Sequence, residues 1–242
     1  MTEPLDILAI MAHPDDAELL CGGSLAKSSS MGQRVGVLDL TQGEAGTTGN
    51  AGIRAHEAAQ ASAVLGLSVR RNAKLTDSEL INDNHSRSVL VKVIRELAPR
   101  TVVTHSKEAR HPDHRQAAQL VYDSCFLSGI KNYRSEGKIH RPDSVIHCLL
   151  FREELERPTF VIDITEHIDD KLRAIECFES QFAGKTAAGE VFKGGDRPLV
   201  DQVKMHCAFH GSRVRTCYGE PFWTRETVKL NSFADPNLVS AF

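Results

Sequence analysis

The sequence predicts an α/β fold, a Rossmann-like three-layer sandwich with a mostly parallel sheet and a less regular C-terminal extension. Three observations support this prediction. Short apolar runs alternate with helical segments from residue 5 to about residue 182, glycine or proline follows several of the helical segments, and polar loops follow the apolar runs. Strands that alternate with helices are typical of parallel sheets covered on both faces.

Two strands and one helix are predicted in the first 41 residues. Residues 5–11 (LDILAIM) are apolar enough for a buried strand, and residues 16–30 are predicted to form a helix that ends before Gly32. Residues 34–41 (RVGVLDLT) are β-branched and apolar, which predicts a second strand. The glycine-rich stretch at 42–52, QGEAGTTGNAG, is expected to be a loop.

Two more helices are predicted before residue 100. The first carries small residues on one face and can end at Gly66. The second spans residues 83–98, where Asp83 can cap the start and Pro99 follows the end. The small face of the first helix consists of Ala55, Ala58, Ala59, Ser62 and Ala63, and the apolar face of the second consists of Val89, Val93, Ile94 and Leu97.

The alternation continues through the second half of the chain. Strands are predicted at 101–106, 144–151 and 159–164, and helices at 117–125 and 165–181. The pattern weakens from about Ala183. We therefore expect one domain over residues 1–242, with a core at about 1–182 and a C-terminal elaboration at about 183–242.

Composition excludes several classes of protein. The chain has 242 residues, a formal net charge of −3 and 25% charged residues, so it lacks the basic field that nucleic-acid binding requires. No stretch approaches 18 apolar residues, and the N-terminus has no basic region before its short apolar run, which Asp6 interrupts. We expect a cytoplasmic protein with neither a nucleic-acid nor a membrane partner.

The cysteine pattern argues against a structural zinc site built from thiolates. None of the six cysteines forms a C-x-x-C pair, so we expect mostly buried, reduced thiols. They are Cys21, Cys125, Cys148, Cys177, Cys207 and Cys217.

Two His/Asp-rich segments follow predicted strands. AHPDD comes directly after residues 5–11, and SKEARHPDH comes after the strand that begins at Thr101. In the common Rossmann-like strand order these two strands are neighbours, and ligands bind where the strand order reverses. The sequence therefore predicts that the two segments meet at a ligand site.

These segments contain the donors of a catalytic metal site. Catalytic zinc is typically held by three protein ligands with one open position, and His13, Asp16 and His114 supply such a set. Asp15 is a free carboxylate that can act as general base. His111 lies three residues before His114, so it can reach the same pocket and stabilise an oxyanion.

Each residue alone also has a structural interpretation. Asp15 with Glu18 resembles a capping pair at a helix start, and one histidine near a helix start is more often a surface or capping residue. Arg54 and Arg110 can be solvated residues or can grip an anionic or sugar group. His105 is expected to be a structural histidine whose hydrogen bonds are satisfied within the fold.

The sequence gives poor support to a nicotinamide-dependent enzyme and to a serine nucleophile elbow. The chain has neither a dinucleotide-binding glycine fingerprint in its strand–helix context nor a G-x-S-x-G motif.

The motifs AHPDDAEL and HPDH resemble those of the LmbE/PIG-L family of zinc-dependent N-deacetylases. The similarity extends over about residues 5–182 and, more weakly, over YGEPFWTRE at 218–226. It is strongest to the bacillithiol-biosynthesis branch, whose members deacetylate N-acetylglucosaminyl-L-malate. The segments that carry it include DLTQGEAGTTGNAGIRAHEAA, RHPDHRQAAQLVYDSCFLSGI, RPDSVIH, FVIDITEHI and SQF.

The resemblance implies a role for each matching residue. The expected zinc ligands are His13, Asp16 and His114, and the expected catalytic residues are Asp15 as base, His111 as oxyanion stabiliser and Asp113 as the carboxylate that orients a histidine. The expected substrate-binding residues are Arg54 and Arg110. One Zn²⁺ or another divalent ion per chain is implied, as are a small sugar conjugate as substrate and a homo-oligomer, often a hexamer in this branch.

Two segments depart from the family pattern. Ser78 in KLTDSEL stands where relatives usually have glycine, and serine resists the positive φ that glycine permits. Pro221 stiffens CYGEPFW, and residues 183–205 match little. Because these segments are expected to help shape the substrate pocket, the departures bear on the identity of the substrate more than on the reaction type. The alternatives are a deacetylase of an inositol conjugate or of a chitooligosaccharide, and a metal-binding sugar-recognition module without turnover.

Overall fold

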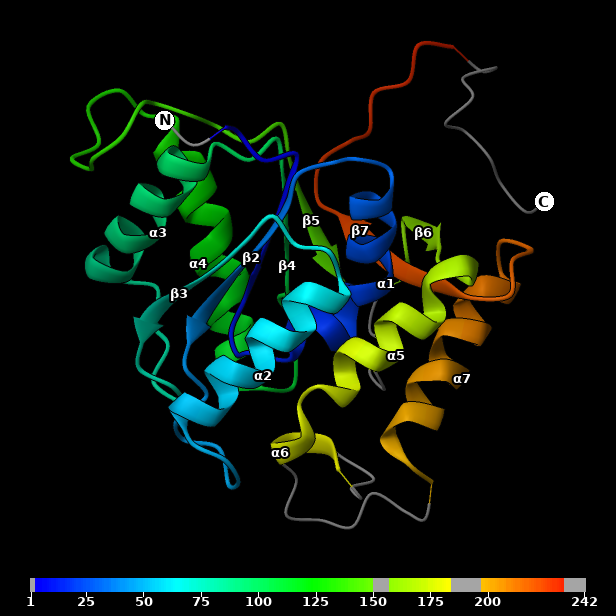
Figure 1. The fold of residues 1–242 in the computed structure, drawn as a ribbon. Helices are drawn as coiled ribbons and strands as arrows, with labels where there is room; N and C mark the ends of the chain where they lie inside the picture. Colours follow the sequence, from blue (N-terminus) through cyan, green and yellow to red (C-terminus); the bar gives the residue numbers. More distant parts are fainter. Residues whose placement is uncertain (1–2, 150–156, 184–196, 233–242) are drawn as a thin grey trace.

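The computed structural model describes residues 3–149, 157–183 and 197–232, and these form one seven-stranded sheet with helices on both faces (Figure 1). The strand order is β3-β2-β1-β4-β5-β7-β6, which confirms the predicted α/β class. The strands are β1 (Ile7–Met11), β2 (Val35–Thr41), β3 (Val69–Leu75), β4 (Thr101–Thr104), β5 (Ser144–Cys148), β6 (Phe160–Asp163) and β7 (Gly219–Thr224).

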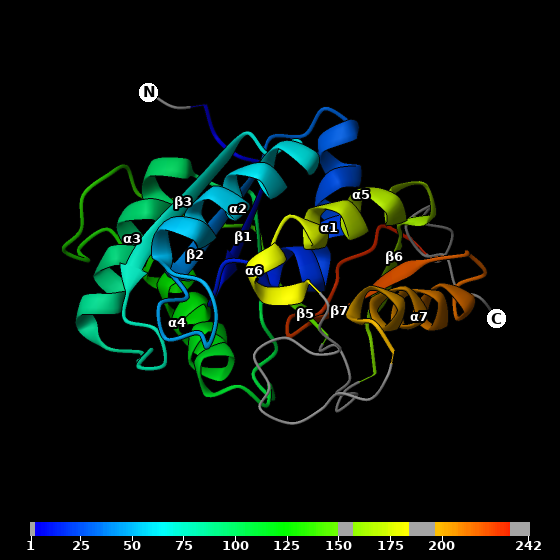
Figure 2. The ribbon, with the colours of Figure 1, turned by 60° about the horizontal axis from the view of Figure 1, so that its bottom comes forward.

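The helices divide between the two faces of the sheet (Figure 2). One face is covered by α3 and α4, and the other by α1, α2 and α5, with α7 beyond α5. The helices are α1 (Asp16–Ser30), α2 (Ala51–Val64), α3 (Asn84–Leu97), α4 (Pro112–Ser128), α5 (Ile168–Glu176), α6 (Glu179–Phe182) and α7 (Leu199–Ser212), with a 3₁₀ turn at Thr165–His167.

The predicted reversal of strand order lies at β1. This strand pairs in parallel with β2 on one side and with β4 on the other, where Ile7 aligns with Thr101 and Ala9 with Val103. The loops after β1 and β4 therefore leave the sheet side by side at its carboxyl edge. This arrangement confirms that the two His/Asp-rich segments are neighbours in space.

Several elements differ from the sequence prediction. Strand β3 was not predicted, because its sequence VRRNAKL carries charges that hide the strand pattern. The helix expected at 165–181 is instead a 3₁₀ turn, α5 and α6, interrupted at Cys177 and Phe178. In the strand expected at 144–151, β5 ends at Cys148, and residues 150–151 lie outside the described residues.

The C-terminal region is more regular than expected. Helix α7 packs on β7, and β7 inserts between β5 and β6, antiparallel to both. The extension predicted at 183–242 thus completes the core sheet, although residues 184–196 and 233–242 lie outside the described residues. The pairing of β7 could not be predicted from the sequence, because its partner strands lie about 60 and 75 residues earlier in the chain.

A buried ion pair fastens this late strand to the core. Lys171 and Glu220 are each 1% exposed, and the Lys171 Nζ to Glu220 Oε1 distance is 2.6 Å. Lys171 also donates to the carbonyls of Glu18 and Leu19, while Glu220 accepts from the backbone amides of Gly23 and Ser24. Buried charges need such partners, and here the backbone partners of both side chains are supplied by α1.

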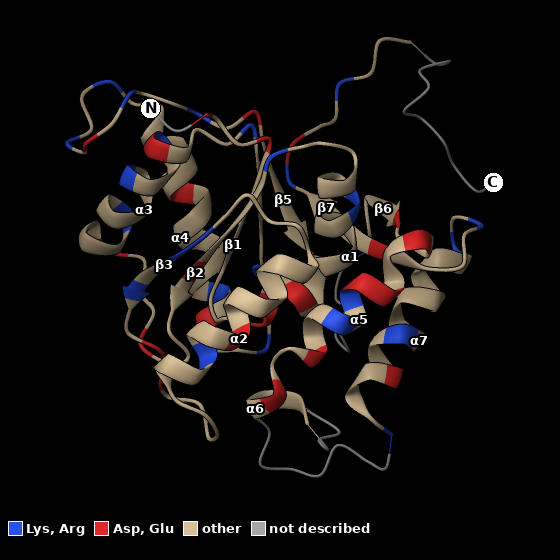
Figure 3. Cartoon of the chain, in the orientation of Figure 1, with Lys and Arg blue, Asp and Glu red and all other residues tan. Residues whose placement is uncertain are grey.

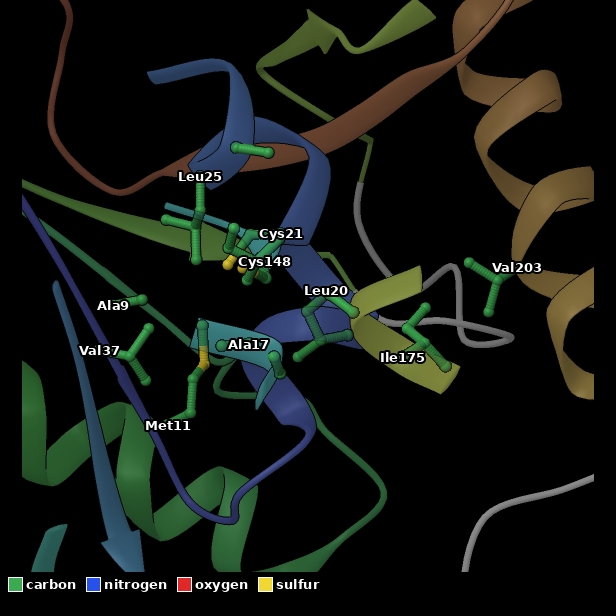
Figure 4. Packing of buried hydrophobic residues seen from close by; sticks show 14 of the residues in the cluster. Ala9, Met11, Ala17, Leu20, Cys21, Leu25, Val37, Cys148, Ile175 and Val203 are labelled. Atoms are coloured by element: carbon green, nitrogen blue, oxygen red, sulfur yellow. The ribbon is translucent and has the colours of Figure 1, made fainter. Parts of the chain in front are cut away.

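The apolar core also accounts for most of the cysteines. Cys21 on α1 and Cys148 at the end of β5 are buried side by side (Figure 4), and burial with their mutual hydrogen bond raises the pKa of Cys21. All six cysteines lie among the described residues and are free thiols, four of them buried, which confirms the predicted pattern. Thiols in such surroundings behave as small hydrophobic side chains.

Charged residues of both signs are interspersed over the described part of the chain (Figure 3). Within that part, no helix combines the length and the apolar character that crossing a membrane requires.

Candidate active site

The loop after β1 folds back on itself through its own polar groups. The backbone amide of His13 donates to Asp16 Oδ2 at 2.8 Å, and the amide of Asp16 donates to the carbonyl of His13 at 3.3 Å. Asp15 adopts a left-handed backbone with φ of 117°. Asp16, at the start of α1, contacts His105 and His114 after β4, while the Asp15 side chain contacts Arg54 of α2.

The three predicted metal ligands come together. Asp16 Oδ1 lies 3.2 Å from His114 Nε2, and Asp16 Oδ2 lies 3.2 Å from His13 Nδ1. One donor atom from each residue lies within 4.8 Å of the others. Burial alone would raise the pKa of Asp16, but the imidazoles of His114 and His105 hold it well below its usual range. Two imidazoles around an ionised carboxylate suit a divalent metal ion.

A second set of donors shares His13. Atoms of His13, His111 and Asp113 also lie within 4.8 Å of one another. The sets use different sides of the shared ring, because His13 Nε2 lies 3.3 Å from Asp113 Oδ2 while Nδ1 faces Asp16. Burial opposes a charge on His13, but hydrogen bonds to Asp113, Asp16 and Asp77 raise its pKa well above the usual value.

Asp15 is buried next to the ligands without being one of them. Burial raises the pKa of Asp15 to about 7, even though the charge of Arg54 opposes that shift. Among the described residues, its side chain makes no capping hydrogen bond to α1, and Glu18 instead pairs with Arg70 at 2.6 Å. The capping interpretation of Asp15 and Glu18 is therefore wrong, and Asp15 keeps a carboxylate poised near neutral pH.

Arg54 lies behind Asp15. Its guanidinium is 4% exposed and donates to the carbonyl of Pro14 and, at 3.0 Å, to Asp15 Oδ2. Gly43 permits this packing, because a Cβ at that position would lie 2.9 Å from Arg54 Cζ. The structure thus places Arg54 against the expected base, and its predicted contact with substrate stays a prediction.

His111 and Asp113 occupy the N-terminus of α4. The backbone amide of Asp113 donates to His111 Nδ1 at 3.2 Å, so the side chain caps the helix. A ring that accepts at Nδ1 carries its proton on Nε2, and burial together with the His114 and His13 charges lowers the pKa of His111. The neutral ring then offers an Nε2–H donor. The Asp113 carboxylate contacts His13.

Asp77 was not predicted from the sequence, whereas His105 is the buried, hydrogen-bonded histidine that was expected. Asp77 Oδ1 lies 3.1 Å from His13 Nε2, and hydrogen bonds to His13 and to backbone amides lower the pKa of Asp77 to about 2 although burial opposes them. His105 accepts from the amide of Ala12 at 2.9 Å and stacks on His114 with centroids 4.0 Å apart. Asp77 follows β3 at the carboxyl edge, so predicting β3 would have revealed it.

Ser78 adopts the left-handed backbone that its identity disfavours. Its φ is 64°, and its backbone amide donates to Asp113 Oδ2 at 2.7 Å. We expect Ser78→Gly to raise the free energy of unfolding by about 0.5–1 kcal/mol, because the steric cost at positive φ exceeds the added entropy of the unfolded chain. Urea denaturation measures this. Ser88→Gly within α3 should instead destabilise, and equal effects of both variants would contradict the explanation.

Arg110 is exposed on the loop between β4 and α4, one residue before His111. The carbonyl of Arg110 accepts a hydrogen bond from Arg115 Nη1 at 2.7 Å, which helps to define the loop. The structure thus brings both predicted arginines to the loops around the ligands, one buried and one exposed.

The region that contains the predicted site residues is similar to known N-deacetylases. Residues 8–125, which contain every predicted site residue, match the family model described as PIG-L, GlcNAc-PI de-N-acetylase. A diacetylchitobiose deacetylase from Thermococcus kodakarensis is 29% identical over 187 residues, covering 73% of this chain and 70% of that protein. A 1D-myo-inositol 2-acetamido-2-deoxy-alpha-D-glucopyranoside deacetylase from Acidothermus cellulolyticus is 26% identical over 232 residues, covering 73% of this chain and 80% of that protein.

A solved structure resembles nearly the whole chain. The conserved protein TT1542 from Thermus thermophilus has a TM-score of 0.85 and 31% sequence identity, and the match covers 95% of this chain and 99% of that one. The likeness therefore includes the C-terminal helix and strand as well as the region around the ligands.

Proposed function

We propose that this chain, which belongs to the PIG-L family and is an N-deacetylase, hydrolyses the N-acetyl group of an N-acetylglucosamine conjugate. The observation that carries this proposal is the convergence of His13, Asp16 and His114 beside Asp15, a buried carboxylate that is not one of the ligands and that pairs with Arg54. A purely structural metal site would not need that carboxylate.

The proposed metal is Zn²⁺, held by His13, Asp16 and His114. The donor set fits, because two imidazoles and one carboxylate are typical of catalytic zinc and leave a position open. In such a site, zinc supplies Lewis-acid polarisation of the amide carbonyl.

The remaining groups of the site suit the proton transfers of amide hydrolysis. Asp15 accepts a proton from the attacking water, and its pKa of about 7 matches that task near neutral pH. The Nε2–H of His111 stabilises the oxyanion. When the C–N bond breaks, protonated Asp15 gives the proton that it took from water to the amine, and acetate and a free amine result.

The proposed substrate is N-acetylglucosaminyl-L-malate. This substrate rests on the sequence resemblance to the bacillithiol branch, while the curated relatives named above act on diacetylchitobiose and on an inositol glucosaminide. The malate part carries two carboxylates that need cationic partners. Arg110, exposed beside His111, is the arginine that we assign to them. We expect Arg54 to affect every substrate through its contact with Asp15.

Comparing substrates tests this assignment. We expect acetate release from the malate conjugate to exceed release from N-acetylglucosamine, and Arg110→Ala to reduce kcat/KM for the malate conjugate alone by roughly 10- to 100-fold, the value of a charged hydrogen bond. Arg54→Ala should lower both rates alike. Diacetylchitobiose and the inositol conjugate complete the panel.

Arg100→Ala is the matched control, since Arg100 lies just before β4, at the opposite edge of the sheet. Equal kcat/KM for the malate conjugate and N-acetylglucosamine in the wild type would contradict the proposed substrate. The homo-oligomer, the cytoplasmic location and the division of one domain near residue 182 stay predictions.

A further inference from the structure

We propose that Asp77 is a positioning residue for the metal ligand His13. Asp77 Oδ1 lies 3.1 Å from His13 Nε2, and Asp113 Oδ2 lies 3.3 Å from the same nitrogen. Two carboxylates therefore converge on one side of the imidazole while Nδ1 faces Asp16. This inference rests on the proposed metal site.

The orientation of Asp77 is set by the glycine-rich loop behind it. Asp77 Oδ2 accepts from the backbone amide of Ala45 at 2.9 Å, and the amide of Asp77 donates to Glu44 Oε1 at 3.0 Å. The other oxygen of Glu44 accepts from the amide of Gln42 at 3.0 Å. Asp77 is thus fixed at both its backbone and its side chain, and Oδ1 is directed at His13.

Asp113 approaches the ring from another element. It belongs to α4, and its Oδ2 also accepts the amide of Ser78, the residue after Asp77. The turn at Asp77 and Ser78 therefore connects the two carboxylates. Each carboxylate is held by a backbone amide, so neither needs to move for His13 to find a partner.

This geometry selects the nitrogen that binds the metal. Imidazole binds a metal through an unprotonated nitrogen, and a carboxylate partner on the other nitrogen fixes the tautomer and increases ligand basicity. With the proton of His13 held at Nε2 by Asp77 and Asp113, the lone pair lies on Nδ1, toward Asp16. Asp77 is 8% exposed, which fits a residue that acts through His13.

Asp77→Asn tests the role with little change of shape. The asparagine has one acceptor oxygen for two donors, His13 Nε2–H and the Ala45 amide, and it has no charge. We expect zinc affinity, measured by competition with a chromogenic chelator, to weaken by about 10- to 100-fold. At saturating zinc, kcat should fall far less than the affinity. The absorption bands of the Co²⁺-loaded protein should shift, because they report the ligand geometry.

Asp83→Asn is the matched control. Asp83 also accepts a backbone amide, that of Ser86 at 2.8 Å, but it caps α3 and interacts with Ser86 and His85 and with none of the proposed ligands, so zinc affinity should not change. Asp113→Asn should weaken zinc as well, and the double variant should lose less than the product of both effects, because both carboxylates act on one nitrogen.

The outcomes separate this inference from the proposed function. If wild-type protein binds no zinc, the proposed metal site fails. If the wild type binds zinc and Asp77→Asn binds it equally tightly with an unchanged Co²⁺ spectrum, the positioning role is overturned. Should the thermal midpoint of metal-free Asp77→Asn fall, the Co²⁺ spectrum of the folded variant at saturating Co²⁺ decides, and a spectrum equal to that of the wild type would overturn the positioning role.

Discussion

Asp15→Asn is expected to retain its metal and to lose about 10²- to 10⁴-fold in kcat, the usual contribution of a general base. Asp15 is not among the proposed ligands, and its pKa of about 7 suits proton transfer at neutral pH. Asparagine has a similar shape and tolerates the left-handed backbone at this position, where φ is 117°. The fold should therefore be preserved.

Acetate release and elemental analysis of the same sample measure this prediction. Asp83→Asn, which keeps the cap of α3, should match the wild type in both quantities. A small loss of kcat with full metal content would mean that another group is the base. Complete loss of metal from Asp15→Asn would mean that the carboxylate serves the ligand set instead.

His114→Ala is expected to reduce bound metal from about one ion per chain to nearly none, because a three-ligand site loses one of its donors. His114 Nε2 faces Asp16 Oδ1 at 3.2 Å. The buried His105 Nε2 also lies 3.3 Å from Asp16 Oδ2, but it already accepts the Ala12 amide, so we do not expect His105 to replace His114. Activity should disappear with the metal. Elemental analysis after dialysis measures the change.

His167→Ala is the matched control for this loss. His167 contacts Asp170 and Ser30 beside α5, away from the ligands, and its removal should leave metal content unchanged. Equal metal in His114→Ala and wild type would contradict the assignment. If metal instead disappeared from His111→Ala alone, the ion would use the second donor set of His13, His111 and Asp113.

Sequence alone was sufficient for the α/β class and for the neighbouring placement of the two His/Asp-rich loops. Both follow from local pattern and strand topology, because alternating strands and helices form a parallel sheet whose strand order reverses beside β1. His13, Asp16 and His114 could be selected for the same reason, since each lies directly after a strand or at a helix start and has the chemistry of a ligand.

Tertiary structure was needed for what surrounds those ligands. Asp77 follows β3, an edge strand that was not predicted because its sequence is charged. Asp77 contacts His13 and is held by Glu44 and Ala45 of the glycine-rich loop, which lies more than 30 residues earlier in the chain. Arg54 was predicted from the sequence to bind substrate, which stays a prediction, but only the structure shows its contacts with Gly43 and Asp15. β7 is held between β5 and β6 by partners far away in sequence, such as Lys171 for Glu220. Local patterns carry no record of such contacts, because burial and pairing between distant segments exist only once the chain has folded.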